Sequence, residues 1–526
     1  MKIIALSIIT FLIFPLTFDA QVSFTNQSTY GGADFDYPAE IISAPDGGYF
    51  LLSSVKSSTT GNVTVSNFGE EDFVLVKYDA NHAIEWQKNY GGSNRDVPYE
   101  LFIVNNNLLL VGITKSPVSG NKTATNFGNY DVWVVKTDMD GNIIWDKTFG
   151  GNERDILKAQ TQLENGNLVL ATSSFSGISG NKTTPNAGFD DYWIFEINED
   201  GDYVWENTLG TDKQDIPDDI FYFDNNIYIT GTSAGEVNGD KTEPLYGFSD
   251  YWIVKIDATG NMIWDKSIGA NGVNGYISKL FVDADSIQVF NLGNNPMSGM
   301  RNVPLKGEQD IWRVSLSHSG DVLSQKAYGG NLRESVHSIL ELNGNLLLFA
   351  ISNSDISLDK SEDSQGDTDF WPILINQSGD IIWQKTIGGS QADGLGNYAV
   401  RPNDKLIVSL PSKSPISGDK TTPNYGDYDT WIVELNITSL SNENFDFQDF
   451  TVYPNPFKDN IVLSGENWKN VEKVEVTDAM GKVVASKNIS ATFNNTISIS
   501  TEDFASGSYI LNVTTINGVQ SYKMMK

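Results

Sequence analysis

Short apolar runs alternate with polar turns along most of this chain, and the same order of runs and turns returns every 59 or 60 residues. In the copy at residues 91–149 the pattern predicts four strands, near 99–104, 108–114, 131–136 and 143–149. Tight turns join the first strand to the second and the third to the fourth, while a long polar loop, residues 115–130, separates the middle two. Four short antiparallel strands connected in this way describe one blade of a β-propeller.

An aspartate at the predicted start of the third strand marks the repeat. It occurs seven times, as Asp72, Asp131, Asp191, Asp250, Asp310, Asp369 and Asp429. A Trp follows two positions later in six copies, and Val74 takes that place in the first. A fixed period indicates one unit copied in tandem, each copy burying its apolar face against its neighbours. We interpret these acids as structural, because a residue present in every copy meets a need that every copy shares.

The last copy is incomplete at its C-terminal end. It contains three predicted strands, whereas residues 24–30 near the N-terminus align with the fourth strand of the first copy, residues 84–90. A strand from the N-terminus would therefore complete the last blade and leave no sheet edge open. We predict an all-β fold, a seven-bladed β-propeller of four-stranded blades over residues 21–437, closed by this N-terminal strand.

Composition narrows the chemistry. The net charge is −32, from 67 acidic and 35 basic residues, so the sequence argues against nucleic acid as a partner. Cysteine is absent and histidine occurs three times, which argues against thiolate chemistry and an imidazole metal cluster. A bound metal would then be a hard cation held by oxygen atoms, and Ca²⁺ is the candidate.

The N-terminus has the layout of a secretory signal peptide. Lys2 precedes an apolar run interrupted by Pro15, and the run ends before Ala20. We expect residues 1–20 to be removed on export. No later segment is apolar enough to span a bilayer, so we expect the mature chain to have no transmembrane segment.

One face of the predicted propeller carries the longer loops and is the default binding face. Its loops hold Ser-Gly-Asn/Asp-Lys-Thr motifs and a Gly-Gly turn followed by an acid or its amide. These residues are Asp36, Asp96, Asp155, Asp215, Asn274, Glu334 and Asp393. They could tie down their own loops, or they could bind a ligand, with Ca²⁺ as a further candidate at this long-loop face. We expect non-enzymatic recognition or adhesion here, of a glycan or a surface protein.

Two other functions stay open on the sequence. The first is an enzyme that acts on extracellular polysaccharide, with acids of the same face as general acid and base. The second is a structural surface component without a small ligand. A unique site has to break the repeat, and the fifth copy diverges most, with Asn274 in place of the acid and Ser324 in place of the fourth-strand Trp.

A segment of different composition follows the repeats. After a predicted linker, residues 438–448, strand-like runs over 449–526 predict a small immunoglobulin-like β-sandwich. Its motifs are a Tyr-Pro-Asn-Pro opening, a glycine turn, a Gly-x-Tyr strand and a final lysine. The residues are Tyr453, Pro454, Asn455, Pro456, Gly481, Gly507, Tyr509 and Lys526. In this order they resemble the type A C-terminal sorting domain of the type IX secretion system. The resemblance implies handling by the type IX machinery and a secreted or outer-membrane surface location.

Overall fold

The computed structural model describes residues 23–275, 277–394, 397–401, 405–436, 451–464, 471–478, 482–488, 496–515 and 518–526. The predicted signal peptide, the predicted linker and Gly481 lie outside these residues. The chain separates into two compact units, Met1–Leu440 and Ser441–Lys526. In the described part of the chain, no helix is long and apolar enough to cross a membrane.

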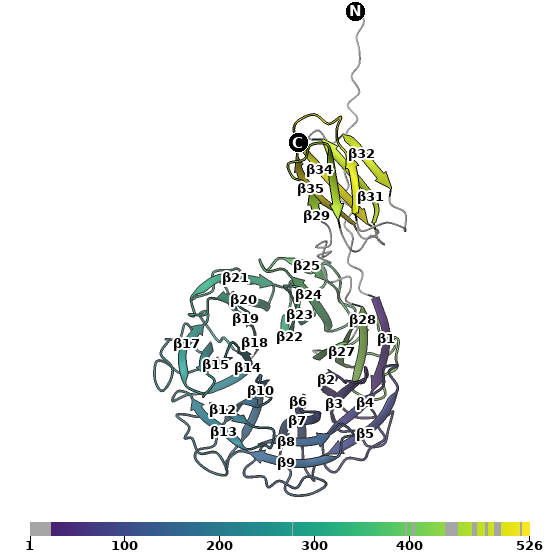
Figure 1. Cartoon of the computed structure of the whole chain (residues 1–526). Coiled ribbons are helices and arrows are strands. Elements are labelled where there is room, and N and C mark those ends of the chain that lie inside the picture. The colour runs from purple at the N-terminus through teal and green to yellow at the C-terminus, as the bar shows by residue number, and fades with distance from the viewer. Residues whose placement is uncertain are drawn as a thin grey trace, which may run out of the picture. The chain divides into compact units, whose positions relative to one another are not determined.

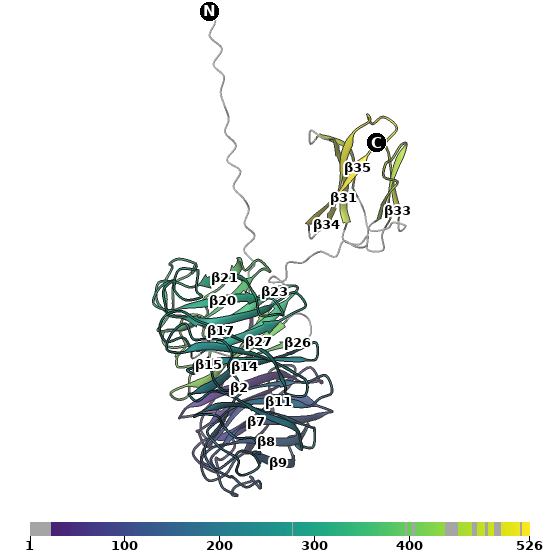
Figure 2. The same ribbon diagram turned by 90° about the vertical axis from the view of Figure 1, so that its left-hand side faces the viewer.

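The described residues of the first unit form seven four-stranded antiparallel sheets around a central opening (Figure 1). Figure 2 shows the same ring from its edge. The arrangement is propeller-like, because the first strand of each sheet lies at the centre and the fourth at the rim.

The strands are as follows. The first four sheets contain β2 Asp36–Ser43, β3 Tyr49–Val55, β4 Asp72–Tyr78 and β5 Ile84–Tyr90; β6 Asp96–Val104, β7 Asn107–Thr114, β8 Asp131–Asp138 and β9 Ile143–Phe149; β10 Asp155–Gln162, β11 Leu168–Ser174, β12 Asp191–Ile197 and β13 Tyr203–Leu209; β14 Asp215–Phe223, β15 Asn226–Ser233, β16 Asp250–Asp257 and β17 Met262–Ile268. The other three contain β18 Ser278–Val282, β19 Ile287–Gly293, β20 Asp310–Leu316 and β21 Val322–Tyr328; β22 Glu334–Leu342, β23 Asn345–Ser352, β24 Asp369–Ile375 and β25 Ile381–Gln384; β26 Asn397–Arg401, β27 Lys405–Ser412, β28 Asp429–Asn436 and β1 Ser23–Tyr30.

The core lies between neighbouring sheets. The second and third strands are buried on both faces because each sheet is covered by a sheet on either side. Trp133 is fully buried, and its ring centroid lies 4.9 Å from that of Phe73 in the preceding sheet. The Trp of the third strand, present in six of the seven sheets, is therefore inter-sheet core, which is the structural interpretation of the sequence pattern.

One predicted strand boundary is wrong. The first strand of the copy at 91–149 begins at Asp96, not at residue 99, because Asp96 already pairs with Thr114 of β7. The pairing then shifts by one residue between Pro98 and Glu100. Such a β-bulge tolerates a proline, which has no N–H to donate, and so the strand continues through a residue that signals a loop.

The seventh sheet is completed by the N-terminal strand, as the alignment of the repeats predicts. β1 pairs antiparallel with β28, and Thr29 lies opposite Trp431. Gln27 Oε1 accepts from Trp431 Nε1 at 3.2 Å and from the backbone N–H of Thr421 at 3.0 Å. In the third sheet Glu206, on the fourth strand, accepts from Trp193 and Thr183 in the same way. Gln27, near the N-terminus, thus makes the hydrogen bonds that a fourth-strand residue makes in the third sheet.

The second unit consists of two antiparallel sheets packed face to face (Figure 2). One contains β29 Thr451–Tyr453, β30 Asn460–Ser464 and β33 Thr496–Ser500, and the other contains β32 Val483–Asn488, β31 Val471–Asp478, β34 Ser508–Thr515 and β35 Gly518–Met525. Ile461 and Leu463 from the first sheet and Val476 and Leu511 from the second share one buried core. The unit is therefore a small β-sandwich.

We expect removal of residues 21–30 to lower the melting temperature sharply, because β28 and the buried Tyr30 position would lose their cover. A finer test is Gln27→Ala, which removes the acceptor shared by Trp431 and Thr421. Asn26→Ala, one residue away at the irregularity in the pairing, is the control. Differential scanning calorimetry should show a lower melting temperature for Gln27→Ala than for Asn26→Ala. Equal melting temperatures for the deletion and the wild type would contradict closure by β1.

Candidate functional site

The structure places the seven predicted long-loop residues inside the protein. Five of them open the first strand of their sheet, and Asn274 and Asp393 lie four residues before theirs. Each side chain is at most 4% exposed: Asp36, Asp96, Asp155, Asp215, Asn274, Glu334 and Asp393. Asp96 is typical, because Oδ2 accepts from the Gly92 N–H at 2.7 Å and from the Ser116 hydroxyl at 2.8 Å. These contacts tie the Gly-Gly turn to the long loop of the same sheet.

These side chains do not form an open acidic surface. Their oxygens are occupied by loop N–H and hydroxyl groups, as Glu334 shows with Gly330 and Ser352. Ligand binding by these residues stays a prediction, and so does Ca²⁺ at this face. Across the residues that the structure describes, no group of three or more Asp, Glu or His side chains is placed to hold a metal ion.

The repeat aspartates lie at the ends of the third strands and are fully buried. They are Asp72, Asp131, Asp191, Asp250, Asp310, Asp369 and Asp429. Asp131 Oδ2 accepts from the backbone N–H of Phe127 at 2.5 Å and of Gly128 at 3.3 Å. The carboxylate holds the end of the long loop, which is the structural role that the sequence predicts.

Each junction between two sheets brings a repeat aspartate close to the long-loop residue of the next sheet. A Cβ at Gly150 would lie 2.2 Å from Asp131 Oδ1 and 3.0 Å from Asp155 Oδ2, so the two carboxyl groups converge on one point. Asp131 Oδ1 is buried without a hydrogen-bond partner. Burial, with Asp155 as a further cause, raises the pKa of Asp131 to about 7.

At one junction an amide replaces one of the two carboxyl groups. Asn274 replaces the acid beside Asp250, and its Nδ2 donates to Asp250 Oδ1 at 3.2 Å. Asp250 Oδ1 is accordingly partnered, whereas the corresponding Oδ1 of Asp131 is not. An amide donates an N–H where a protonated carboxyl would donate an O–H, so Asn274 is the neutral counterpart of a protonated acid at the other junctions.

The Ser-Gly-Asn-Lys-Thr motif folds the long loop onto the Trp of the same sheet, as the third sheet shows. Lys182 is buried, with Nζ 5.8 Å from the centroid of the Trp193 ring, and it donates to Asn186 Oδ1 at 3.0 Å. The next residue, Thr183, donates its backbone N–H to Glu206, which also accepts from Trp193. The lysine is therefore part of the loop's support and is not displayed to solvent.

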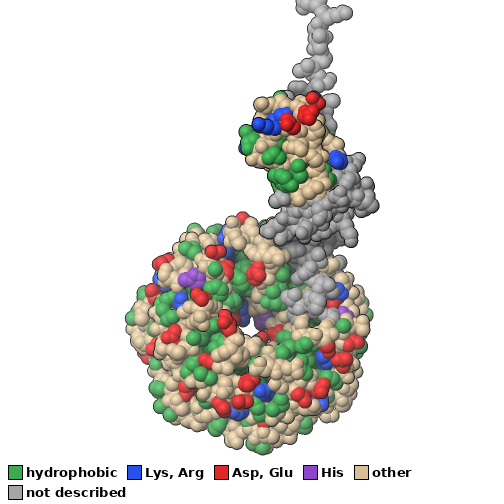
Figure 3. Space-filling model, viewed as in Figure 1, with side chains coloured by type: hydrophobic (Ala, Val, Ile, Leu, Met, Phe, Trp, Pro, Cys, Tyr) green, Lys and Arg blue, Asp and Glu red, His purple; other side chains and the backbone are tan. Residues whose placement is uncertain are grey.

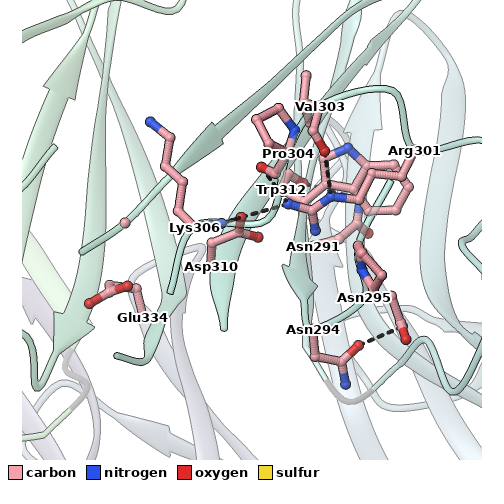
Figure 4. Close-up of polar contacts among 12 residues, drawn as sticks. Asn291, Asn294, Asn295, Arg301, Val303, Pro304, Lys306, Asp310, Trp312 and Glu334 are labelled. Atoms are coloured by element: carbon pink, nitrogen blue, oxygen red, sulfur yellow. Dashed lines mark hydrogen bonds and ion pairs between the residues drawn. The ribbon is translucent and has the colours of Figure 1, made fainter. Parts of the chain in front are cut away.

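The divergent fifth sheet keeps this support with different residues (Figure 4). Arg301 occupies the lysine position and forms a buried ion pair with Asp310, with Nη2 and Oδ2 2.5 Å apart. Its guanidinium lies 5.3 Å from the centroid of the Trp312 ring, and Asn295 Nδ2 donates to Asn274 Oδ1 at 3.0 Å. The divergence that the sequence marks is thus a rearranged loop support.

The long loops expose a set of residues that sequence reasoning missed. One aliphatic or methionine side chain stands immediately before the Ser or Asn of the motif in six of the seven copies, and each is 56–67% exposed. These loop-tip residues are Val118, Ile178, Val237, Met297, Ile356 and Ile416. Their spacing of 59 or 60 residues, which equals the repeat period, is the sequence signal that could have identified them. The first copy has Thr59 at this position.

We expect the junction carboxyl groups to make the protein less stable as pH rises. The unfolded pKa of Asp is about 3.9, and the folded pKa of Asp131 is about 7. The folded state therefore binds more protons than the unfolded state between these values, and stability falls across this window and levels off above it. Lys122 and Asp155 are the charged groups that act on Asp131. Melting curves from pH 5 to pH 8 should show the decline.

Asp131→Asn tests whether the pair of carboxyl groups destabilises the folded protein at high pH. The amide oxygen of the new Asn side chain can still accept from the Phe127 N–H, while its NH₂ group faces Asp155. We expect this variant to melt a few degrees above the wild type at pH 8 and to show a weaker pH dependence. Asp250→Asn is the matched control at the junction that already holds Asn274, and it should destabilise at both pH values. A lower melting temperature for Asp131→Asn at pH 8 would contradict the unfavourable carboxyl pair.

The predicted sorting residues tie the C-terminal strand into the second unit. Asn455 donates from Nδ2 to the Lys523 carbonyl at 3.0 Å and accepts from the Met525 N–H at 2.9 Å. Gly507 and Lys526 exchange two backbone hydrogen bonds, and Tyr509 is buried in the core with its hydroxyl on the Ala505 carbonyl at 2.7 Å. Tyr453 stays half exposed. The motif thus holds the two ends of this unit together.

Solved structures similar to this chain share only a low level of likeness with it. An ulvan lyase of a new polysaccharide lyase family is 10% identical with a TM-score of 0.45, over 77% of this chain and 95% of that one. A catalytically inactive virginiamycin B lyase from Staphylococcus aureus is 12% identical with a TM-score of 0.43, over 78% and 99%. The phage phi92 endosialidase is 10% identical with a TM-score of 0.40, over 95% and 87%. No curated protein matches the chain.

One family model matches the second unit. It is the secretion system C-terminal sorting domain, and it covers residues 451–526. The match spans the β-sandwich and every described residue of the predicted sorting motif. Residues 451–526 are therefore a type IX C-terminal sorting domain, and the protein is secreted to the extracellular space or the cell surface.

Proposed function

We propose that this secreted protein is a seven-bladed β-propeller with an immunoglobulin-like sorting domain, and that it recognises a surface protein through its long-loop face without catalysis. The observation that carries the proposal is the set of six exposed loop-tip residues, which occupy one position in six copies. Single exposed apolar residues are ordinary on protein surfaces, but an apolar residue repeated at one place around a ring is a patterned surface.

The chemistry of the loop tips favours a protein over a glycan. Sugars stack on flat aromatic rings, whereas the six loop-tip side chains are aliphatic or methionine. Val118, Ile178 and Met297 offer no hydrogen bond and gain free energy only when another apolar surface covers them. The net charge of −32 opposes an anionic lipid surface. A protein with apolar side chains of its own is the partner that fits.

The loops present these tips on a prepared frame. The backbone N–H of Ser93 in the Gly-Gly turn donates to the Ser119 hydroxyl at 2.8 Å, next to Val118. Asn121, three residues after Val118, accepts from the Gly91 N–H at 2.9 Å and donates to the Asn89 carbonyl at 2.7 Å. A loop held at several points loses little conformational entropy on binding.

The repeat acids and the Gly-Gly acids do not supply the enzymatic alternative with an open pair of carboxyl groups. Asp96 and Asp131 are fully buried and occupied by loop N–H groups. A glycosidase needs two carboxyl groups that reach the same bond from a defined separation. A polysaccharide-acting enzyme and a purely structural surface component are therefore outcomes of the test and not the proposal.

We expect the six-residue variant with Ser at every loop tip to bind intact cells at least about tenfold more weakly than the wild type, because hydrophobic contacts carry the affinity. The mature protein is titrated onto cells of the producing strain that lack its gene. The control replaces exposed fourth-strand residues of comparable exposure with Ser: Ile144, Val204, Ile263, Leu323 and Ile382. This control should bind as the wild type does, and protease treatment of the cells should abolish binding of both.

A glycan array with and without chelator, together with assays of reducing-sugar release, separates protein recognition from glycan binding and from a polysaccharide-acting enzyme. Turnover of a polysaccharide that is lost in a single acid-to-amide variant would establish an enzyme. Cell binding that survives protease treatment, or equal loss in the loop-tip and fourth-strand variants, would contradict recognition of a protein by the loop tips.

A further inference from the structure

The centre of the ring contains a cavity of about 600 Å³, which the space-filling view shows as a hollow (Figure 3). Residues of all seven innermost strands line it, among them Glu40, Glu100, Gln160, Lys279 and Ser338. This volume falls in the usual range for small-ligand sites, about 300 to 1,000 Å³. The loop tips take no part in lining it.

The strands aim unlike side chains into this cavity. In five of the innermost strands the pairing slips by one residue, for example between Pro38 and Glu40 in β2 and between Val336 and Ser338 in β22. A β-bulge turns a side chain away from the ordinary alternation, and bulges occur often beside binding sites. The position after the slip holds four residue types in the five copies: Glu40, Glu100, Ala159, Asp219 and Ser338. The cavity is thus a place where the repeat loses its symmetry.

One side of the cavity is a pair of carboxyl groups with an amide. Glu40 and Glu100 are hydrogen-bonded to each other, and Gln160 Nε2 donates to Glu100 Oε2. Burial, with the neighbouring carboxyl second, raises the pKa of Glu40 well above its ordinary value, and burial raises that of Glu100 to about 7. Both shifts favour a proton retained between the two carboxyl groups, consistent with their hydrogen bond to each other.

The remaining charged groups of the wall are of both signs. Asp219 lies 3.9 Å from Lys279 and accepts from the Leu280 N–H at 2.7 Å. Lys158 is the second cation of the wall. Burial lowers the pKa of His337 to about 3, so its ring is neutral and hydrogen-bonds to the Asn397 side chain. Acidic and basic side chains thus face one another in the wall, and no single sign of charge is concentrated there.

Two polar atoms of the wall have no partner. Gln160 Oε1 and the Ser338 hydroxyl are both buried and make no hydrogen bond. They belong to β10 and β22, which lie on opposite sides of the opening in Figure 1. A carbonyl oxygen needs a donor, and a hydroxyl can donate or accept. A ligand that carries several hydroxyl groups supplies both kinds of partner.

We propose that the central cavity binds one uncharged, polyhydroxylated sugar unit, held between Glu100 and Gln160 on one side and Ser338 and Asn397 on the other. Hydroxyl groups of such a unit donate to the carboxylate and amide oxygens and accept from the amide and lysine N–H groups. Tyr99 and Tyr398 also line the cavity and add apolar surface to its wall. This site is separate from the loop tips.

The test uses the mature protein on an array of neutral, acidic and amino-sugar glycans, followed by calorimetric titration with the free oligosaccharide of the strongest chain. Gln160→Ala removes one polar partner, and Ser338→Trp fills the cavity. We expect the affinity for a neutral glycan to fall at least tenfold in Gln160→Ala and binding to disappear in Ser338→Trp. Melting curves establish that both variants are folded, and Gln160→Ala keeps the cavity open if Ser338→Trp fails to fold.

The loop-tip variant is the control that separates this site from the proposed function. It should bind the neutral glycan as the wild type does, while both cavity variants should bind cells as the wild type does. Binding only of acidic or amino-sugar chains, binding that survives in a folded Ser338→Trp variant, or no binding to any chain would overturn the proposal. Binding to the array without binding of the free oligosaccharide would overturn it as well.

Discussion

Each sheet of the first unit depends on cover for both of its apolar faces. A single four-stranded sheet with second and third strands as apolar as β7 and β8 would not be stable in water, because both faces would be exposed. In a row, the two end sheets would each lack one neighbour. The ring removes both ends, and the pairing of β1 with β28 joins the two ends of the repeats within one sheet. The packing of the other sheets rests on this closure.

The same constraint explains which residues repeat. The buried Lys, the Trp of the third strand and an acceptor on the fourth strand form one unit, as Lys182, Trp193 and Glu206 show. In the first sheet Val63 and Val74 take the places of Lys and Trp and pack together in the core. The two positions change together because either residue alone would leave a buried polar group without a partner. The lysine ammonium would lack the Trp ring, or the Trp N–H would lack its acceptor.

Two surfaces lie outside this constraint and therefore carry the candidate functions. The loop tips are exposed to solvent and yet keep an apolar residue, as Ile178 does at 67% exposure. The cavity residues face the common centre, where seven strands meet and identical side chains would crowd a narrow space. Charged side chains such as Glu100 and Lys279 can coexist there because the copies differ. The repeated residues thus stabilise the sheets, and the residues that differ between copies line the cavity.

The sequence by itself determined the repeat, the strand order and the closing strand, because a local period of hydrophobic and polar positions specifies which residues must be buried. It also identified the sorting domain, because the order of the motif residues can be read along the chain before any contact such as that of Asn455 with Lys523 forms. The sequence did not decide whether Asp96 and its counterparts after the Gly-Gly turns are buried or exposed. Burial of Asp96 depends on the neighbouring loop, which covers it only in the folded protein. The cavity was beyond the reach of the sequence because Glu40, Gln160 and Ser338 lie far apart in the chain and meet only when the ring closes.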